Sequence, residues 1–479
     1  MSDSWPTSGV DLHLELDPAM GRRAGLEQAL RAAIQTGRLA PQARLPATRK
    51  LAADVGVSRG TVRAAYDQLI AEGYLTARQG SGTAVAGLPP RHTDRPAGLH
   101  DRALPRPRHD LRPGLPDASA FPTAAWLRST RRALGSAPAD AYTYDDPRGR
   151  IELRTALAEY LGRTRGVLAQ PDLIMITSGY VQALALLSRV LSESSMATIA
   201  TEDPGVSFHR EVIRRNGSAV VPLPVDERGA RTDLLAAPGF PPVDAVEVTP
   251  AHQYPTGHTL DPARRQALVD WARSSGALII ENDYDGEFRY GRQPVGAIQG
   301  MAPDHIAYVG TVSKTLGPAL RLGWIVMPHR LLEPLVEAKR HSDRHTETIG
   351  QLALADFIAC HGYDRHVRSC RLRYQRRRDL LLTRLRDRKG LLPPTFSVHG
   401  IAAGLHVLIS LPSEGPTEQD VLHTAAANEV GVGHLGDRWH APGDRPQGII
   451  VGYGTPSEHA YPAAVDALAH VLRTTITQS

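Results

Sequence analysis

Apolar residues near the start of the chain repeat with the spacing of an α-helix. Across residues 22–36 they recur at every third or fourth position and so share one helical face, and Gly37 ends the pattern. A second short helix is expected over 48–56, and a third over 58–72, where the Ser58 hydroxyl suits an N-cap. Two short helices joined by a tight glycine turn are typical of a helix-turn-helix.

The spacing of apolar residues changes after the third predicted helix. The stretch YLTARQGSGTAVAG (74–87) predicts two short strands around Gly80 and Gly82, where a hairpin turn needs positive φ. This hairpin would form a wing beside the helix-turn-helix. Proline and arginine then dominate residues 87–117, which show no apolar period and predict an extended linker.

Beyond the linker, apolar runs rich in β-formers alternate with helical patterns. In chain order these are LIMITSG, VQALALLSRVL, MATIATED, AVEVTP, DPARRQALVDWARSSG, ALIIEND and HIAYVG. Such alternation favours βαβ units and a mainly parallel sheet covered by helices, and a smaller α/β subdomain is expected from about Pro328 onward. The sequence therefore predicts a winged helix-turn-helix over 10–86, the linker over 87–117 and an α/β domain over 118–475.

Composition excludes several classes of protein. The 479 residues are 42% hydrophobic and 22% charged, which is typical of globular proteins with two or three domains. No apolar run reaches the roughly 18 residues of a membrane span, and the acidic, polar N-terminus does not resemble a secretory signal. We therefore expect a cytoplasmic protein that does not enter the membrane.

The cysteines give little reason to expect a metal or a disulfide. Only Cys360 and Cys370 occur, so the chain has neither a disulfide framework nor a CxxC pair. His361 and His366 lie between them and could be read with them as a metal cluster, but the helical spacing and the surrounding arginines favour a solvated helix face. No metal site is expected.

Basic residues are distributed unevenly, although the formal net charge of +5 is by itself weak evidence for nucleic-acid binding. Between residues 44 and 63, five basic residues and one acidic residue, Asp54, give a local charge of +4, which suits a polyanion. Only four of the 55 basic residues are lysines, Lys50, Lys314, Lys339 and Lys389. Because arginine supplies nearly all the generic positive charge, a lysine here indicates a specific role.

The segment LPATRKLAADVGVSRGTVRAAYDQLIAEGYLTARQGSGTAV closely resembles the GntR-type winged helix. The resemblance implies binding to double-stranded DNA, with the start of the third helix in the major groove. The residues expected to contact DNA are Arg49, Ser58, Arg59, Thr61, Arg63, Arg78 and Gly80. For any single arginine the alternative is that it belongs to a solvent-exposed helix face and does not contact DNA. The basic stretch 371–379 could also help to hold DNA, but such a stretch is more often a solvent-exposed helix face.

Six further motifs follow one another through the rest of the chain. They are DDPRGRIELRTALAEYL, TSGYVQAL, TEDPG, VTPAHQYPTG, ENDYDGEFRY and GTVSKTLGPALRLGW. In this order and spacing they resemble fold-type-I aminotransferases, in the form found in MocR-type transcription regulators. The resemblance implies pyridoxal 5′-phosphate (PLP) as cofactor and a homodimer with its sites at the subunit interface.

The same resemblance assigns roles to individual residues. Lys314 follows a predicted strand and matches the Schiff-base lysine, which would be the catalytic residue of an enzyme of this family. Tyr284 matches the residue that bonds the ring hydroxyl, and Asn282 matches the partner of the pyridine nitrogen. The positions that match the phosphate-binding group are Gly179, Tyr180, Thr311, Ser313 and Arg321. Tyr142 or Tyr144 is expected to reach the phosphate of the partner subunit.

Two positions depart from the family pattern. Asn282 stands where the family usually has an aspartate that keeps the pyridine nitrogen protonated, and Val206 stands where a tyrosine is usual. Strand alternation places Asn282 and Tyr284 on one face and Asp283 on the other, so Asp283 cannot easily substitute. Asn282 holds no charge, and the cofactor would therefore be a weaker electron sink.

Three functions remain open at this point. The first is a homodimeric DNA-binding regulator that senses PLP, another B6 vitamer or an amino-acid effector through Lys314. The second is a PLP-dependent aminotransferase that carries a DNA-binding domain, which Asn282 and Val206 disfavour. The third is a domain that no longer binds PLP and only dimerises, which Lys314, Arg321 and Tyr284 disfavour. The sequence does not place the residue that binds a substrate carboxylate, although Arg445 lies near the final strand.

Overall fold

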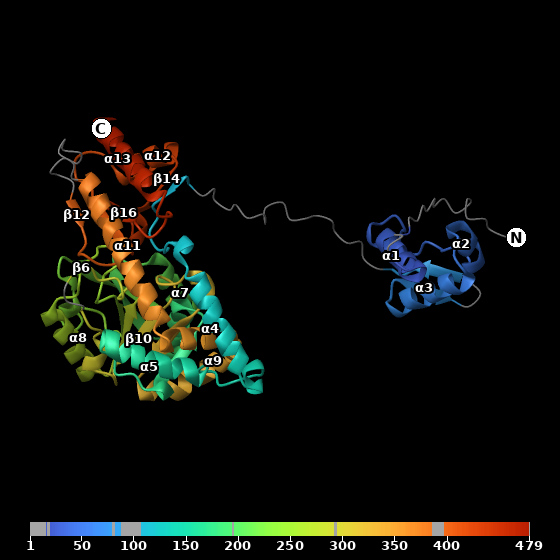
Figure 1. Ribbon diagram of the computed structural model, residues 1–479, viewed down its shortest axis with the longest axis horizontal. Helices are drawn as coiled ribbons and strands as arrows, with labels where there is room; N and C mark the ends of the chain where they lie inside the picture. Colours follow the sequence, from blue (N-terminus) through green and yellow to red (C-terminus); the bar gives the residue numbers. More distant parts are fainter. Residues whose placement is uncertain are drawn as a thin grey trace. The chain divides into compact units, whose positions relative to one another are not determined.

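The chain forms two compact units, Met1–Leu104 and Pro105–Ser479 (Figure 1). The structure is a computed structural model that describes residue 16 and residues 20–78, 82–87, 107–193, 196–291, 295–385 and 397–478. Among these residues, no helix combines the length and the apolar character that crossing a bilayer requires.

The first unit is a three-helix winged domain, as predicted. Its elements are α1 (Arg22–Gln35), α2 (Thr48–Val55), α3 (Arg59–Ala71), β1 (Leu75–Arg78) and β2 (Gly82–Val85). The apolar stripe of α1 packs against α3, and Leu26, Leu30, Val62 and Leu69 are fully buried between them. Gly56 ends α2 with a φ of 69°, which supplies the tight turn.

The second unit is built on an eight-stranded sheet with the order β4-β11-β10-β9-β8-β5-β6-β7. Its strands are β4 (Ile174–Thr177), β5 (Thr198–Asp203), β6 (Ala219–Asp226), β7 (Gly229–Ala230), β8 (Ala245–Val248), β9 (Leu278–Asp283), β10 (Ile306–Thr311) and β11 (Gly323–Val326). The pairs from β6 through β5, β8 and β9 to β10 are parallel. Strand β11 alone of the inner strands runs against its neighbours.

Helices cover both faces of this sheet (Figure 1). They are α4 (Thr123–Ser136), α5 (Ile151–Arg165), α6 (Tyr180–Ser192), α7 (Ser207–Arg215), α8 (Pro262–Ser275), α9 (Leu332–Asp343), α10 (Thr348–Ala359) and α11 (Gly362–Leu385). Alternation along β4 shows the two faces: Ile174 and Ile176 join the core beneath α5 and α10, whereas Met175 joins the core beneath α6 and α9. The predicted parallel sheet covered by helices is confirmed.

A smaller subdomain follows near the C-terminus. A four-stranded antiparallel sheet has the order β12-β13-β16-β15 and packs against helices. Its elements are β12 (Ser397–His399), β13 (His406–Ser410), α12 (Glu418–Ala427), β15 (Gly433–His434), β16 (Gly448–Gly452) and α13 (Tyr461–Gln478).

The end of the predicted linker differs from the structure. Residues 107–117 belong to the second unit, because β3 (His109–Asp110) pairs in parallel with β14 (Val430–Gly431). Leu111 is fully buried there, and its carbonyl accepts a hydrogen bond of 2.7 Å from the Gly452 amide. Asp117 forms a buried ion pair of 2.8 Å with Arg377. Backbone pairing therefore anchors a segment whose proline and arginine content resembles a linker.

Candidate functional site

A cavity of about 430 Å³ opens at the carboxyl ends of the parallel strands, where α/β sheets place their ligands. Every residue predicted to bind the cofactor lines it. These residues are Gly179, Tyr180, Asn282, Tyr284, Thr311, Ser313, Lys314 and Arg321. Val206 lines the same cavity. Residues separated by up to 142 positions in the chain thus meet at one site.

Several hydrogen-bond donors that suit an anion lie together in the cavity wall. Helix α6 begins directly after Gly179, so its free backbone N–H groups and the positive end of its dipole face this region. The hydroxyl oxygens of Thr311 and Ser313 lie 2.8 Å apart, and Arg321 Nη2 donates to Ser178 Oγ at 3.4 Å. A Cβ on Gly323 would lie 2.9 Å from the Gly179 Cα, so glycine allows this close approach.

Lys314 lines the cavity and lies three residues after the end of β10. Its Nζ donates to the carbonyl oxygen of Gly114, in the segment that precedes the second unit's first helix. Burial lowers the pKa of the Lys314 ammonium, while the carboxylate of Asp285 acts in the opposite direction. A lowered pKa increases the share of the neutral amine, which is the form that attacks a carbonyl carbon.

The polar residues at the end of β9 and directly after it lie on two faces, as the alternation predicts. Asn282 and Tyr284 line the cavity. Asp283 lies on the other face, where its carboxylate binds Arg165 at 2.7 and 3.0 Å and accepts a hydrogen bond of 2.7 Å from the Tyr308 hydroxyl. Asp283 is therefore fully engaged away from the cavity.

Two buried acids in the cavity wall were not found from the sequence. Glu202 accepts hydrogen bonds from Thr249, and burial raises its pKa to about 7. Glu247 Oε1 accepts a hydrogen bond of 2.6 Å from the Tyr180 hydroxyl and lies 2.8 Å from His209 Nδ1. A signal was present, because Glu247 interrupts the otherwise apolar run AVEV of a buried strand.

His252, Asp285 and His406 form a third group that the sequence did not predict. Their potential ligand atoms all lie within 4.8 Å of one another, and all three side chains are buried. A hydrogen bond of 2.8 Å joins His252 Nδ1 to Asp285, and the Tyr284 hydroxyl lies 3.2 Å from the same nitrogen. Burial lowers the pKa of His406 to about 3, so this imidazole is neutral at physiological pH.

Arg438, not Arg445, provides a guanidinium in the cavity. Arg438 lines the cavity with its Cζ 5.7 Å from the ring centre of Tyr254. Arg445 is exposed and lies over Trp439, and neither of these two residues lines the cavity. Arg438 could not be selected from the sequence because a loop after β15 brings it to the site.

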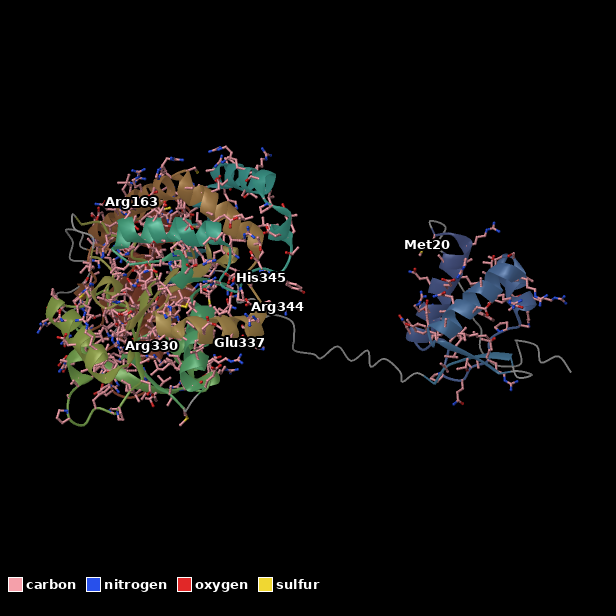
Figure 2. The ribbon with its side chains drawn as sticks, turned by 90° about the horizontal axis from the view of Figure 1, so that it is seen from below. Met20, Arg163, Arg330, Glu337, Arg344 and His345 are labelled. Carbon is pink, nitrogen blue, oxygen red and sulfur yellow. The ribbon has the colours of Figure 1, made fainter. Side chains whose placement is uncertain are left out.

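Tyr142 and Tyr144 point to solvent and do not line the cavity of their own chain. Their exposed fractions are 59% and 78%. The guanidinium of Arg344 lies 4.5 Å from the ring centre of Tyr144, and the His345 ring contacts the edge of that ring. Figure 2 shows Arg344 and His345 side by side on the second unit. Both tyrosines are accessible to another chain.

In the first unit, the predicted DNA-contacting side chains are separated from the core. Arg49, Arg59 and Arg63 are exposed, while the opposite face of α3 is buried. Ser58 caps α3 by accepting a hydrogen bond of 3.0 Å from the Thr61 amide. Gly80 and the side chain of Arg78 lie outside the described residues.

Comparison with known proteins first defines the class. Residues 23–85 match the family of bacterial regulatory proteins of gntR type, and residues 115–433 match the aminotransferase class I and II family. The chain is thus a transcription regulator that joins a GntR-type DNA-binding domain to an aminotransferase-like domain.

Two relatives define the family more closely. The pyridoxine biosynthesis regulator PdxR of Corynebacterium glutamicum is 33% identical, over 90% of this chain and 92% of that protein. The probable rhizopine catabolism regulatory protein MocR of Rhizobium meliloti is also 33% identical, over 92% of each chain. The chain belongs to the MocR/PdxR-type transcriptional regulators.

Solved structures show the fold of the larger domain. The kynurenine aminotransferase of Pyrococcus horikoshii, in complex with PMP, superposes with a TM-score of 0.68 at 24% identity. It covers 76% of this chain and 91% of its own. An archaeal alanine:glyoxylate aminotransferase gives a TM-score of 0.68 at 26% identity, with coverages of 76% and 90%.

Proposed function

We propose that this regulator binds PLP at Lys314 and that PLP, another B6 vitamer or an amino acid changes its affinity for DNA. The observation that carries the proposal is the convergence of all eight predicted cofactor residues on one cavity around the Lys314 amine. The name of one relative agrees with it, since PdxR is named as a regulator of pyridoxine biosynthesis.

The residues present fit PLP at each of its polar groups. The start of α6, with Thr311, Ser313 and Arg321, would hold the phosphate. Tyr284 would bond the ring hydroxyl, and the buried Oδ1 of Asn282, which lacks a partner among the described residues, would face the ring nitrogen. When bound, PLP supplies an aldehyde that combines with primary amines. Arg438 would hold the carboxylate of an amino-acid effector.

Residues 113–115 are the part of the cavity wall that is nearest in sequence to the linker. These residues line the cavity, and Gly114 accepts the hydrogen bond of Lys314. Earlier in the chain, β3 fixes the same segment to β14. If the Lys314 amine were engaged by bound PLP, Gly114 would lose this hydrogen-bond donor, and the segment continuous with the linker would change its contacts.

A homodimer is part of the proposal. Large apolar side chains are exposed on α4 and at the start of α5, at Leu127, Leu134 and Ile151. Together with Tyr142 and Tyr144 they offer a surface for a second copy of the chain. Two copies would present two α3 helices to the two half-sites of an operator.

Borohydride reduction in the presence of PLP should leave a pyridoxyl group on Lys314. Peptide mapping by mass spectrometry locates the label. Lys314→Ala should lose the label, whereas Lys50→Ala, which removes an exposed lysine of α2, should keep it. A label on another lysine of the wild-type protein, or an equal yield of label from Lys314→Ala, would overturn the assignment.

A further inference from the structure

A buried carboxylate lies directly behind the residue that replaces the family's aspartate. Glu247 is on β8, and Asn282 is on the neighbouring parallel strand β9. Asn282 Nδ2 donates to Glu247 Oε1 at 3.4 Å, and both residues line the cavity. They are 7% and 4% exposed, so their interaction is shielded from solvent.

Glu247 is held in its ionised form. Burial by itself would raise its pKa, but His209 and the hydrogen bonds from Tyr180 and Asn282 lower the pKa below its ordinary value. All three donors converge on the same oxygen, Oε1. Because a carboxylate only accepts, His209 donates from Nδ1.

The position of Glu247 fixes the orientation of the Asn282 amide. An ionised carboxylate must be met by the amide nitrogen, so Nδ2 faces Glu247. Oδ1 is then left buried and without a hydrogen-bond partner among the described residues. A buried acceptor of this kind requires a donor. Asn282 Oδ1 could accept a hydrogen bond from a protonated pyridine nitrogen. An unprotonated pyridine nitrogen is itself an acceptor and could not bond to Oδ1.

We propose that Glu247 is the residue that keeps the pyridine nitrogen of bound PLP protonated, acting through Asn282. Glu247 is a positioning residue here, because only Asn282 would touch the ring. This inference rests on the proposed binding of PLP at Lys314. It changes the expectation drawn from the sequence, in which the loss of the aspartate leaves the ring nitrogen uncharged. The negative charge that the family places on the aspartate is carried here by Glu247, one side chain further from the ring.

The protonation state can be read by ¹⁵N NMR of the full-length protein loaded with PLP labelled at the ring nitrogen. The wild type should show the chemical shift of a protonated pyridine nitrogen. Glu247→Gln, which keeps the shape but removes the charge, should show the shift of the unprotonated ring. Its affinity for PLP should fall about tenfold, since a charge-assisted hydrogen bond becomes a neutral one.

Two further variants separate charge from structure. Glu247→Gln combined with Asn282→Asp returns a carboxylate to the cavity and should restore the protonated shift. Glu281→Gln is the control. Glu281 is a buried acid of β9 that accepts hydrogen bonds from the amides of Ile298 and Gln299 and does not line the cavity, so this variant should leave the ring protonated.

The outcomes distinguish the two proposals. If PLP labels Lys314 and the wild-type ring is unprotonated, the role of Glu247 is wrong and PLP binding stands. The same conclusion follows if Glu247→Gln keeps the protonated ring. If PLP does not bind at Lys314 at all, the proposed function itself fails.

Discussion

Replacing Arg59 and Arg63 together with alanine should weaken binding to a specific operator by roughly 30-fold or more. Each arginine that contacts a base edge contributes about 1–3 kcal/mol, and about 1.4 kcal/mol corresponds to a factor of ten. Both side chains are exposed and lie one turn apart at the start of α3. Their removal should leave the core of the winged domain unchanged, because the opposite face of α3 makes that core.

The measurement uses an operator that the wild-type protein selects from a randomised pool of DNA duplexes. Arg38→Ala is the matched control, because this exposed arginine follows α1 and lies outside α2, α3 and the wing. It should bind within about twofold of the wild type if non-contacting surface charges contribute little. A double variant that protects the same operator bases at the wild-type concentration would show that α3 does not read the DNA.

Asp283→Asn should destabilise the second unit by about 3–5 kcal/mol, because it leaves the buried charge of Arg165 without its partner. The two side chains are 1% and 2% exposed, and two hydrogen bonds join them. Asparagine keeps only one acceptor oxygen, so at least one of the three hydrogen bonds that Asp283 accepts from Arg165 and Tyr308 is also lost. The effect should be on folding and not on the cavity, because Asp283 lies on the opposite face of β9.

Urea unfolding of the full-length chain, followed by tryptophan fluorescence, measures this effect. Trp324 belongs to the core on that side of the sheet and reports the second unit. Asp172→Asn is the control, because Asp172 is 79% exposed and pairs with Arg148 and Arg154 only at 3.6 Å. It should change stability by no more than about 1 kcal/mol. An Asp283→Asn protein as stable as this control would mean that the ion pair is not retained in solution.

Local patterns predicted most of the fold, whereas the residues that line the cavity were chosen from the resemblance to fold-type-I aminotransferases. The helices of the winged domain follow from their apolar spacing, with Ser58 and Gly56 marking the ends that the structure shows. The separation of Asn282 and Asp283 follows from strand alternation alone. By contrast, β3 is only two residues long, and its pairing with β14 depends on a contact more than 300 residues away in the chain. No periodicity can indicate such a strand.

Local sequence patterns do not indicate residues that act through tertiary contacts. Asn282 was interpreted as the loss of a charge because its neighbours in the chain offer no substitute on the same face. The substitute, Glu247, comes from the adjacent strand, 35 residues earlier. Arg438 lies at the cavity because its carbonyl oxygen accepts hydrogen bonds from the Gly205 amide and from Arg210, more than 220 residues earlier in the chain. Chemistry of this kind can be predicted only once the order of the strands is known.

The most direct test of the proposed regulator is its affinity for the selected operator, measured with and without PLP, for the wild type and for Lys314→Ala. We expect PLP to change the wild-type dissociation constant by roughly 5-fold to 150-fold, the usual range of coupling between two sites. Lys314→Ala should bind the operator but should not respond to PLP. An equal response of both proteins, or a wild-type affinity that PLP does not alter although Lys314 is labelled, would contradict it.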